Sequence, residues 1–169
     1  SFVDYAAGYS AAFAIAAAIL QRQRTGEGCY ISTSMLEVAL SLMAPEAAAK
    51  QVAPDAPKRR EAGLQTYETA EGTLILGAFK PSQYRKLGTC FKDLGYDIPL
   101  LADIQTWEDV WMHSDTMRSE MSEVLVQKSA ATWQKHFELS DIPAERVATL
   151  EEAVSTTQLS ARGYFKPSP

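Results

Sequence analysis

The chain has 169 residues, of which 46% are hydrophobic, 9% aromatic and 22% charged. This composition predicts a globular chain with a hydrophobic core and argues against general disorder. The formal net charge is −5, which repels polyanions, and the basic clusters at Arg22/Arg24 and at 58–60 are short and separate. We therefore expect no nucleic-acid binding.

The cysteines and histidines show no spacing typical of a metal site. Cys29 and Cys90 are far apart, which favours reduced thiols in a cytoplasmic protein over a disulfide framework. His113 and His136 have no partner at ligand spacing, so no metal is expected. The pattern predicts cytoplasmic localisation.

The first predicted element is an alanine-rich helix over 5–24, with Asp4 as its N-cap and Gly26 as its left-handed stop. The run has weak lipid affinity and no preceding basic residues, so we expect it to pack among protein elements and not to enter a membrane. A short β-prone segment, 29–33, predicts a strand, and a second helix is expected from Ser34.

Residues 44–63 are rich in Ala, Pro, Lys and Glu, which predicts an extended linker and a domain boundary. Beyond it, 64–69 and 73–79 flank a turn and predict a β-hairpin. Lys80-Pro81 then opens a helix that reaches Leu94, with Gly95 as its stop.

Large apolar residues recur at spacings of three or four through 106–139, so this whole stretch is predicted to be helical. The stripe is typical of a buried core; its members are Trp107, Trp111, Met117, Met121, Val124, Leu125, Trp133 and Phe137. Pro143 breaks the pattern, and a short helix over 150–154 and a turn over 158–162 are expected after it.

The glycine-rich turn Thr25–Gly28 superficially suggests a phosphate-binding loop. Such loops lie between a strand and the N-terminus of a helix, whereas this turn leaves a helix C-terminus, whose carbonyls repel phosphate. The turn is therefore interpreted as a helix stop.

Asp4 is the one candidate for chemistry. Aspartate before a helix is a common N-cap, and composition by itself supports only that role. The free N–H groups and the dipole of a helix N-terminus also stabilise a carboxylate as an anion, which keeps it available as a nucleophile toward an electrophilic carbonyl. The two roles are compatible.

The stretch from Asp4 to Gly8, the alanine-rich helix and the Arg-x-x-Thr-Gly-x-Gly-like ending at 21–28 resemble the best-marked segment of the family III CoA-transferases, also called the CaiB/BaiF family. Three later segments continue the resemblance, namely Ile31–Glu37, the hairpin sequence Tyr67–Gly72, and Ile142–Val147 with Glu151/Glu152. The resemblance covers nearly the whole chain.

The resemblance implies an α/β protein with a large Rossmann-like domain and a smaller α/β domain, arranged as an interlocked homodimer. The chain would hold the end of the first large-domain segment at 1–43, the linker at 44–63, the small domain at 64–155 and the start of a return at 156–169. It is thus expected to be an α+β fragment of a longer protein, inactive alone.

The resemblance also implies that Asp4 is the catalytic nucleophile, moving CoA from an acyl-CoA to a carboxylic acid through an aspartyl-CoA thioester. Coenzyme A thioester is then a substrate and no cofactor is bound permanently. The residues that bind CoA are left unassigned.

Two alternatives stay open. The same family includes α-methylacyl-CoA racemases, in which an upstream His works with the aspartate and some members carry a supporting Glu where Lys80 stands here. A lysine cannot accept a hydrogen bond from an imidazolium, which favours the transferase. The second alternative is a non-catalytic dimerisation or scaffold module in which Asp4 only caps a helix.

Overall fold

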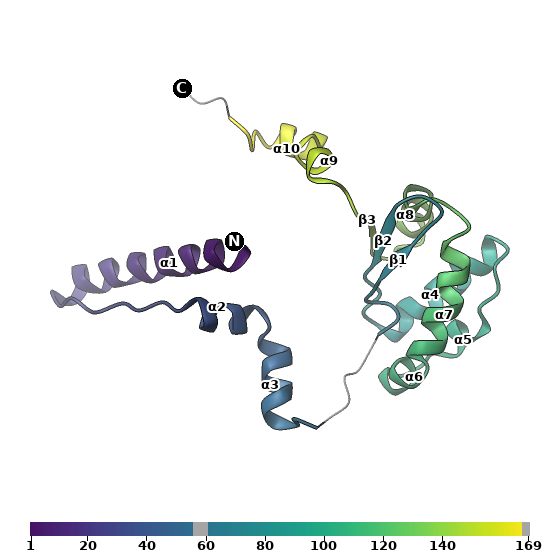
Figure 1. Ribbon diagram of the computed structural model, residues 1–169, viewed down its shortest axis with the longest axis horizontal. Helices are drawn as coiled ribbons and strands as arrows, with labels where there is room; N and C mark the ends of the chain where they lie inside the picture. The colour runs from purple at the N-terminus through teal and green to yellow at the C-terminus, as the bar shows by residue number, and fades with distance from the viewer. Residues whose placement is uncertain (56–60, 167–169) are drawn as a thin grey trace. The chain divides into compact units, whose positions relative to one another are not determined.

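A computed structural model describes residues 1–55 and 61–166 of the chain. It divides into two compact units, Ser1–Lys58 and Arg59–Pro169, each described here by itself. The division falls inside the predicted 44–63 segment. Helices dominate and a small antiparallel sheet accompanies them, so the α/β class is confirmed (Figure 1).

The first unit is built from three helices, α1 (Phe2–Thr25), α2 (Met35–Leu42) and α3 (Ala44–Val52). Gly26 ends α1 in the left-handed conformation with φ 80°, and its N–H donates to Arg22 O at 2.8 Å, as predicted. Ser34 caps α2 by accepting from Glu37 N–H at 3.4 Å. α1 and α2 lie against each other.

Three predictions for this unit are wrong. Ser1 is the N-cap of α1, so Asp4 lies inside the first turn. Residues 29–33 form no strand, because a strand requires a neighbouring strand and none of the described strands pairs with this segment. Residues 44–52 are helical and not extended, since Pro45 near the helix start supplies a preset φ and the alanines favour helix.

None of the residues of α1, α2 and α3 is buried. By length and composition α1 could cross a membrane, with a mean hydropathy of 1.5 over its most apolar window. One such helix is weak support for a membrane span, because core helices of water-soluble proteins have the same composition.

The second unit contains a three-stranded antiparallel sheet in the order β1 (Thr66–Glu68), β2 (Thr73–Leu76), β3 (Ala144–Arg146). β1 and β2 form the predicted hairpin, with Tyr67 opposite Leu74. The third strand was not predicted, because its three residues carry no alternating pattern and their pairing depends on β2, some seventy residues earlier.

Two helices lie against this sheet: α7 (Ser114–Leu125) contacts β1, and α8 (Ala130–Leu139) contacts both β2 and β3. The other helices of the unit are α4 (Pro81–Asp93), α5 (Pro99–Asp103), α6 (Trp107–Met112), α9 (Leu150–Val154) and α10 (Thr157–Ala161). The predicted helices at 81–94 and 150–154 are confirmed, and the turn at 158–162 is the short helix α10.

The prediction that 106–139 is entirely helical is confirmed for most of the stretch, which holds three helices, and is wrong at 113 and 126–129, where the helices are interrupted. Thr106 starts α6 by accepting from Asp109 N–H at 3.2 Å, and Ser129 starts α8 by accepting from Thr132 N–H at 3.3 Å. Such local capping favours new helix starts over one long helix. The apolar period survives the breaks because every helix turns its apolar face toward the same core.

The core centres on Trp133, which is fully buried and lies edge-on to Phe91 with ring centroids 5.6 Å apart. Its indole N–H donates to Leu125 O at 2.8 Å. Phe137 stacks on the same indole at 5.6 Å. Most of the predicted stripe is buried here, whereas Trp107 stays 38% exposed.

Candidate active site

Asp4 lies in the first turn of α1, and its side chain is 62% exposed. The amino group of Ser1 is 3.9 Å from its Oδ2. At this position the carboxylate is next to the free N–H groups at the start of the helix. An exposed anion at a helix start can reach an electrophile that approaches from outside the helix.

Gly8 lies one turn after Asp4 on the same helix face, since residues four apart are neighbours on a helix surface. A Cβ placed at Gly8 would meet nothing within 4 Å. The surface beside the carboxylate is therefore open and without a side chain of its own.

A different face of α1 carries aromatic side chains at helical spacing. Four of them are more than two-thirds exposed, namely Phe2, Tyr5, Tyr9 and Phe13. They form one stripe, because residues at spacings of three and four share a helix face. This stripe lies on a different face from the one that carries Asp4. α1 thus separates a small-residue face with the carboxylate from an aromatic face.

The turn after α1 has the geometry of a helix stop, as predicted. Thr25 Oγ1 donates to Gln21 O at 3.0 Å and accepts from Glu27 N–H at 3.2 Å. These bonds satisfy groups at the helix C-terminus. The turn supplies no cluster of N–H groups at a helix start for a phosphate.

Lys80, the residue used to weigh racemase against transferase, is exposed at the start of α4 in the second unit. Its backbone N–H and that of Phe79 both donate to Gln83 Oε1, at 3.0 and 2.8 Å. These bonds fix the backbone at the helix start, and the ammonium extends from it as a hydrogen-bond donor.

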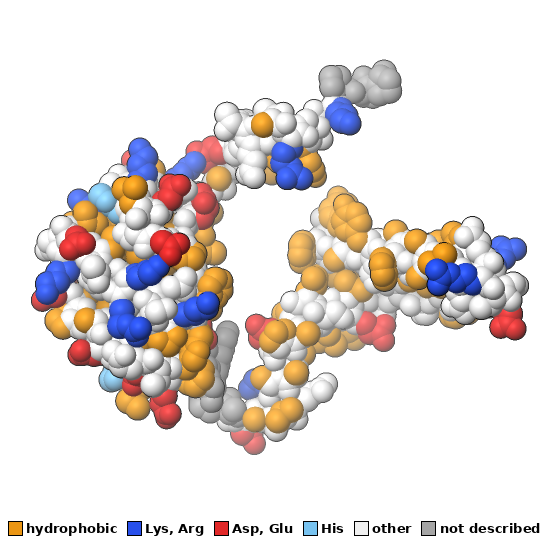
Figure 2. Space-filling model, turned by 180° about the vertical axis from the view of Figure 1, so that it is seen from behind, with side chains coloured by type: hydrophobic (Ala, Val, Ile, Leu, Met, Phe, Trp, Pro, Cys, Tyr) orange, Lys and Arg blue, Asp and Glu red, His pale blue; other side chains and the backbone are white. Residues whose placement is uncertain are grey.

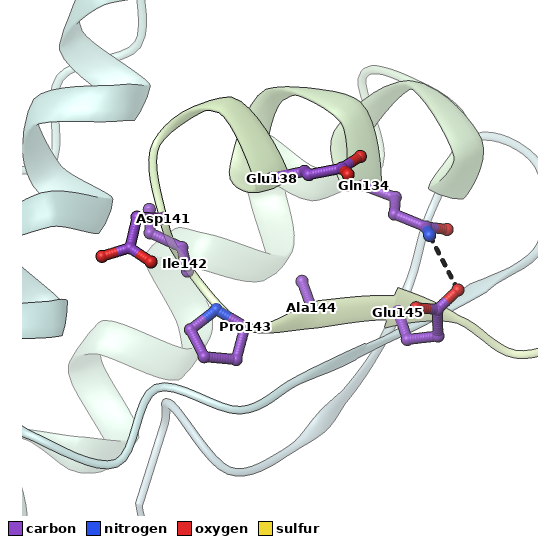
Figure 3. A pocket seen from close by; sticks show the side chains of 7 residues that line it. All are labelled: Gln134, Glu138, Asp141, Ile142, Pro143, Ala144 and Glu145. Carbon is purple, nitrogen blue, oxygen red and sulfur yellow. Dashed lines mark hydrogen bonds between the residues drawn. The ribbon is translucent and has the colours of Figure 1, made fainter.

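The second unit also carries a hollow of about 340 Å³ between α8 and β3 that was not predicted (Figure 3). It is lined by Gln134, Glu138, Asp141, Ile142, Pro143, Ala144 and Glu145. Gln134 Nε2 donates to Glu145 Oε1 at 2.7 Å, and Lys86 pairs with Asp141. The three carboxylates make this hollow unfavourable for the phosphates of CoA.

Charged side chains of both signs are interspersed on the visible face of the second unit (Figure 2). Across residues 1–55 and 61–166, no group of three or more His, Cys, Asp or Glu side chains is arranged to hold a metal ion.

Solved structures share this fold. A mycobacterial protein from Mycobacterium tuberculosis superimposes with a TM-score of 0.78 at 21% identity, over 95% of this chain and 42% of that one. A CaiB/BaiF family protein from Brucella suis superimposes with a TM-score of 0.71 at 22% identity, over 96% of this chain and 44% of that one.

Sequence comparison defines the family. The sequence model of CoA-transferase family III matches residues 1–169, so the chain belongs to that family. It is 28% identical to a probable fatty acyl-CoA transferase of Mycobacterium tuberculosis over 91% of the chain, and 29% identical to the human α-methylacyl-CoA racemase over 96%. It is 26% identical to succinyl-CoA:glutarate CoA-transferase of Mus musculus over 96%.

The chain spans 43%, 43% and 38% of the lengths of these three relatives. Two of the three carry a transferase name and one a racemase name. The family assignment thus agrees with the sequence resemblance, and the names of the relatives include both CoA transfer and racemisation.

Proposed function

We propose that Asp4 is the nucleophile of a CoA-transferase that moves CoA from an acyl-CoA thioester to a carboxylic acid. The observation that carries this proposal is an exposed carboxylate in the first turn of a helix, within a chain of CoA-transferase family III. Coenzyme A thioester acts as a substrate and not as a resident cofactor.

The reaction balances without an added reagent. The Asp4 carboxylate attacks the thioester carbonyl, and CoA leaves as a thiolate. The product is a mixed anhydride of Asp4 and the donor acid. The thiolate then attacks the Asp4 carbonyl and releases the donor acid, leaving an aspartyl-CoA thioester. The acceptor carboxylate attacks that thioester and frees the thiolate again, which leaves a mixed anhydride of Asp4 and the acceptor acid. Attack of the thiolate on the acceptor carbonyl gives the new acyl-CoA and restores Asp4.

Nucleophilic trapping tests the proposal directly. The full-length protein is incubated with an acyl-CoA, then with hydroxylamine, and digested for mass spectrometry. A hydroxamate at Asp4 that is absent in Asp4→Asn supports transfer through a covalent aspartyl intermediate. An unmodified Asp4 in the native protein, under conditions where CoA exchange is measured, contradicts it.

The second candidate is an α-methylacyl-CoA racemase, favoured by the 29% identity to the human racemase. In that reaction Asp4 would exchange a proton at the carbon next to the thioester and would form no bond to the acyl group. Deuterium incorporation at that carbon without a hydroxamate would identify it. Lys80 disfavours it, since an ammonium cannot accept a hydrogen bond from an imidazolium.

Gly8→Ala is predicted to lower activity without lowering stability. The added methyl meets nothing within 4 Å, and replacing an exposed helical glycine by alanine stabilises a helix by about 1 kcal/mol. If the thioester approaches across this face, kcat/KM falls by about tenfold or more. The measurement is steady-state kinetics of the full-length protein together with its thermal unfolding.

Ser10→Ala is the matched control, because it also favours helix but lies on a different face of α1. It is expected to keep full activity. Full activity of Gly8→Ala would show that substrate does not use this face. A lower melting temperature would show that the face packs against protein instead.

The wider setting is part of the same proposal. We place the reaction in the cytoplasm, in a homodimer of the longer protein, with α1 packed against protein and not lipid. The match of the family model to residues 1–169 supports the placement of α1, because it includes that helix in the family's own domain.

A further inference from the structure

Two buried residues, Ala62 and Gly63, lie near the start of the second unit, and we call them its entrance. Two buried tyrosines hold them: the Tyr67 hydroxyl donates to Ala62 O at 2.7 Å, and Tyr84 Oη accepts from Gly63 N–H at 2.8 Å. Ala78 N–H donates to Gly63 O at 2.8 Å. A Cβ at Gly63 would lie 2.4 Å from Ala78 O, so glycine alone fits this entrance.

The contacts of this entrance are neutral. Burial raises the pKa of Tyr84 to about 12 and moves the pKa of Tyr67 further upward, so both phenols stay protonated at ordinary pH. Neutral hydrogen bonds inside a core respond little to dissolved salt, because screening acts on charges that water reaches.

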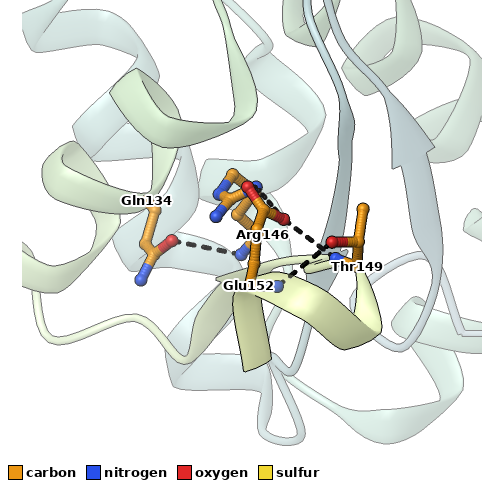
Figure 4. A network of polar contacts seen from close by, with 4 residues as sticks. All are labelled: Gln134, Arg146, Thr149 and Glu152. Carbon is orange, nitrogen blue, oxygen red and sulfur yellow. Dashed lines mark hydrogen bonds and ion pairs between the residues drawn. The ribbon is translucent and has the colours of Figure 1, made fainter. Parts of the chain in front are cut away.

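After β3 the chain is held to the rest of the second unit by a different kind of contact (Figure 4). Arg146 Nη1 lies 3.0 Å from each carboxylate oxygen of Glu152. The same carboxylate accepts from Thr149 N–H at 2.8 Å, and Gln134 Oε1 accepts from Arg146 N–H at 3.1 Å. The side chains of Arg146 and Glu152 are 36% and 46% exposed.

Glu152 therefore makes two kinds of contact after β3. It pairs with Arg146, and it closes a capping box with Thr149, whose hydroxyl accepts from Glu152 N–H at 3.2 Å. A short helix such as α9 is marginal by itself, so its order depends on these contacts. Exposed ion pairs are weakened by salt.

We infer that the second unit holds its two end segments by contacts of different kinds: permanent neutral bonds at the entrance, Ala62–Gly63, and a releasable Arg146–Glu152 pair after β3, called the latch. Release of the latch frees residues 148–154, whereas Val147 N–H keeps its bond to Thr73 O at 2.9 Å and the sheet and the entrance stay closed. The inference is independent of the chemistry at Asp4.

Hydrogen–deuterium exchange with mass spectrometry, at low salt and in 1 M NaCl, tests the inference on the whole chain. Peptides that cover 148–154 are expected to exchange about two- to fivefold faster at high salt, the factor that corresponds to losing an exposed ion pair. Peptides that cover 62–65 serve as the internal reference and are expected to keep their rate.

Two matched variants assign the effect to the ion pair. Glu152→Gln keeps an amide oxygen for the capping box but removes the charge, so 148–154 should exchange about two- to fivefold faster at low salt, with no further effect of NaCl. Glu151→Gln removes a charge from the same helix turn outside the latch. It should retain the salt response of the native chain.

Tyr84→Phe gives the converse result for the entrance. It removes the acceptor for Gly63 N–H, so exchange at 62–65 rises about five- to tenfold while remaining independent of salt. Equal salt responses at 62–65 and 148–154 would overturn the inference. So would a 148–154 segment that is fully exchanged at low salt, or one whose rate Glu152→Gln leaves unchanged.

Discussion

Asp4→Asn is expected to reduce the CoA-transfer rate of the full-length protein by about 10³-fold or more, the scale seen when a nucleophile is removed. The amide has nearly the shape of the carboxylate but does not carry its charge or its nucleophilic oxygen. Loss of the bond-forming group lowers kcat, and substrate affinity is expected to change much less. Initial rates over a range of acyl-CoA concentrations separate the two parameters.

The fold of the variant is expected to be unchanged, because the side chain is 62% exposed and Ser1, not Asp4, is the N-cap of α1. Glu46→Gln is a suitable control, since it removes one exposed carboxylate from the first turn of α3, outside the segments that carry the family resemblance. It should keep most of the activity. A fully active Asp4→Asn protein would exclude the aspartyl intermediate and leave the scaffold alternative in place for this residue.

Trp133→Ala is expected to destabilise the second unit by about 3–5 kcal/mol, the usual cost of deleting a large buried aromatic side chain. The indole is fully buried, contacts the rings of Phe91 and Phe137, and donates to Leu125 O. Its removal leaves a cavity and a buried carbonyl without that donor. Urea denaturation followed by circular dichroism gives the free energy of unfolding.

Leu139→Ala is the matched control on the same helix, because this leucine is 87% exposed. Its free energy of unfolding is expected to stay within about 0.5 kcal/mol of the native value. Trp133→Phe should fall between the two, since it keeps most of the apolar contact and loses the hydrogen bond. A Trp133→Ala protein as stable as Leu139→Ala would show that the core is centred elsewhere.

Sequence patterns predicted the structure well wherever a few neighbouring residues decide it. Gly26 stops α1 because its left-handed conformation suits glycine, and Ser34 caps α2 through a bond only three residues long. The Tyr67–Leu74 hairpin formed as predicted around its turn. The same local rule failed at Asp4, which lies inside the first turn of α1 and not at its N-cap.

The candidate site divides in the same way. Asp4 and Gly8 were selected from the sequence because a family pattern names them, and their common helix face follows from spacing alone. The acidic hollow beside Glu138 and Glu145 was not foreseen, because it depends on how α8 lies against β3. The Tyr84 contact with Gly63 joins residues twenty-one positions apart and carries no sequence signal.

The sequence by itself determined the family, the nucleophile candidate, the stop of α1 at Gly26 and the apolar stripe, because each of these depends on residue identity and short spacing. Tertiary structure alone decided that 144–146 pairs as a third strand and that 29–33 pairs with none of the described strands. Those outcomes depend on distant partners. A strand is stabilised by the strand that pairs with it, and the local pattern does not specify that neighbour.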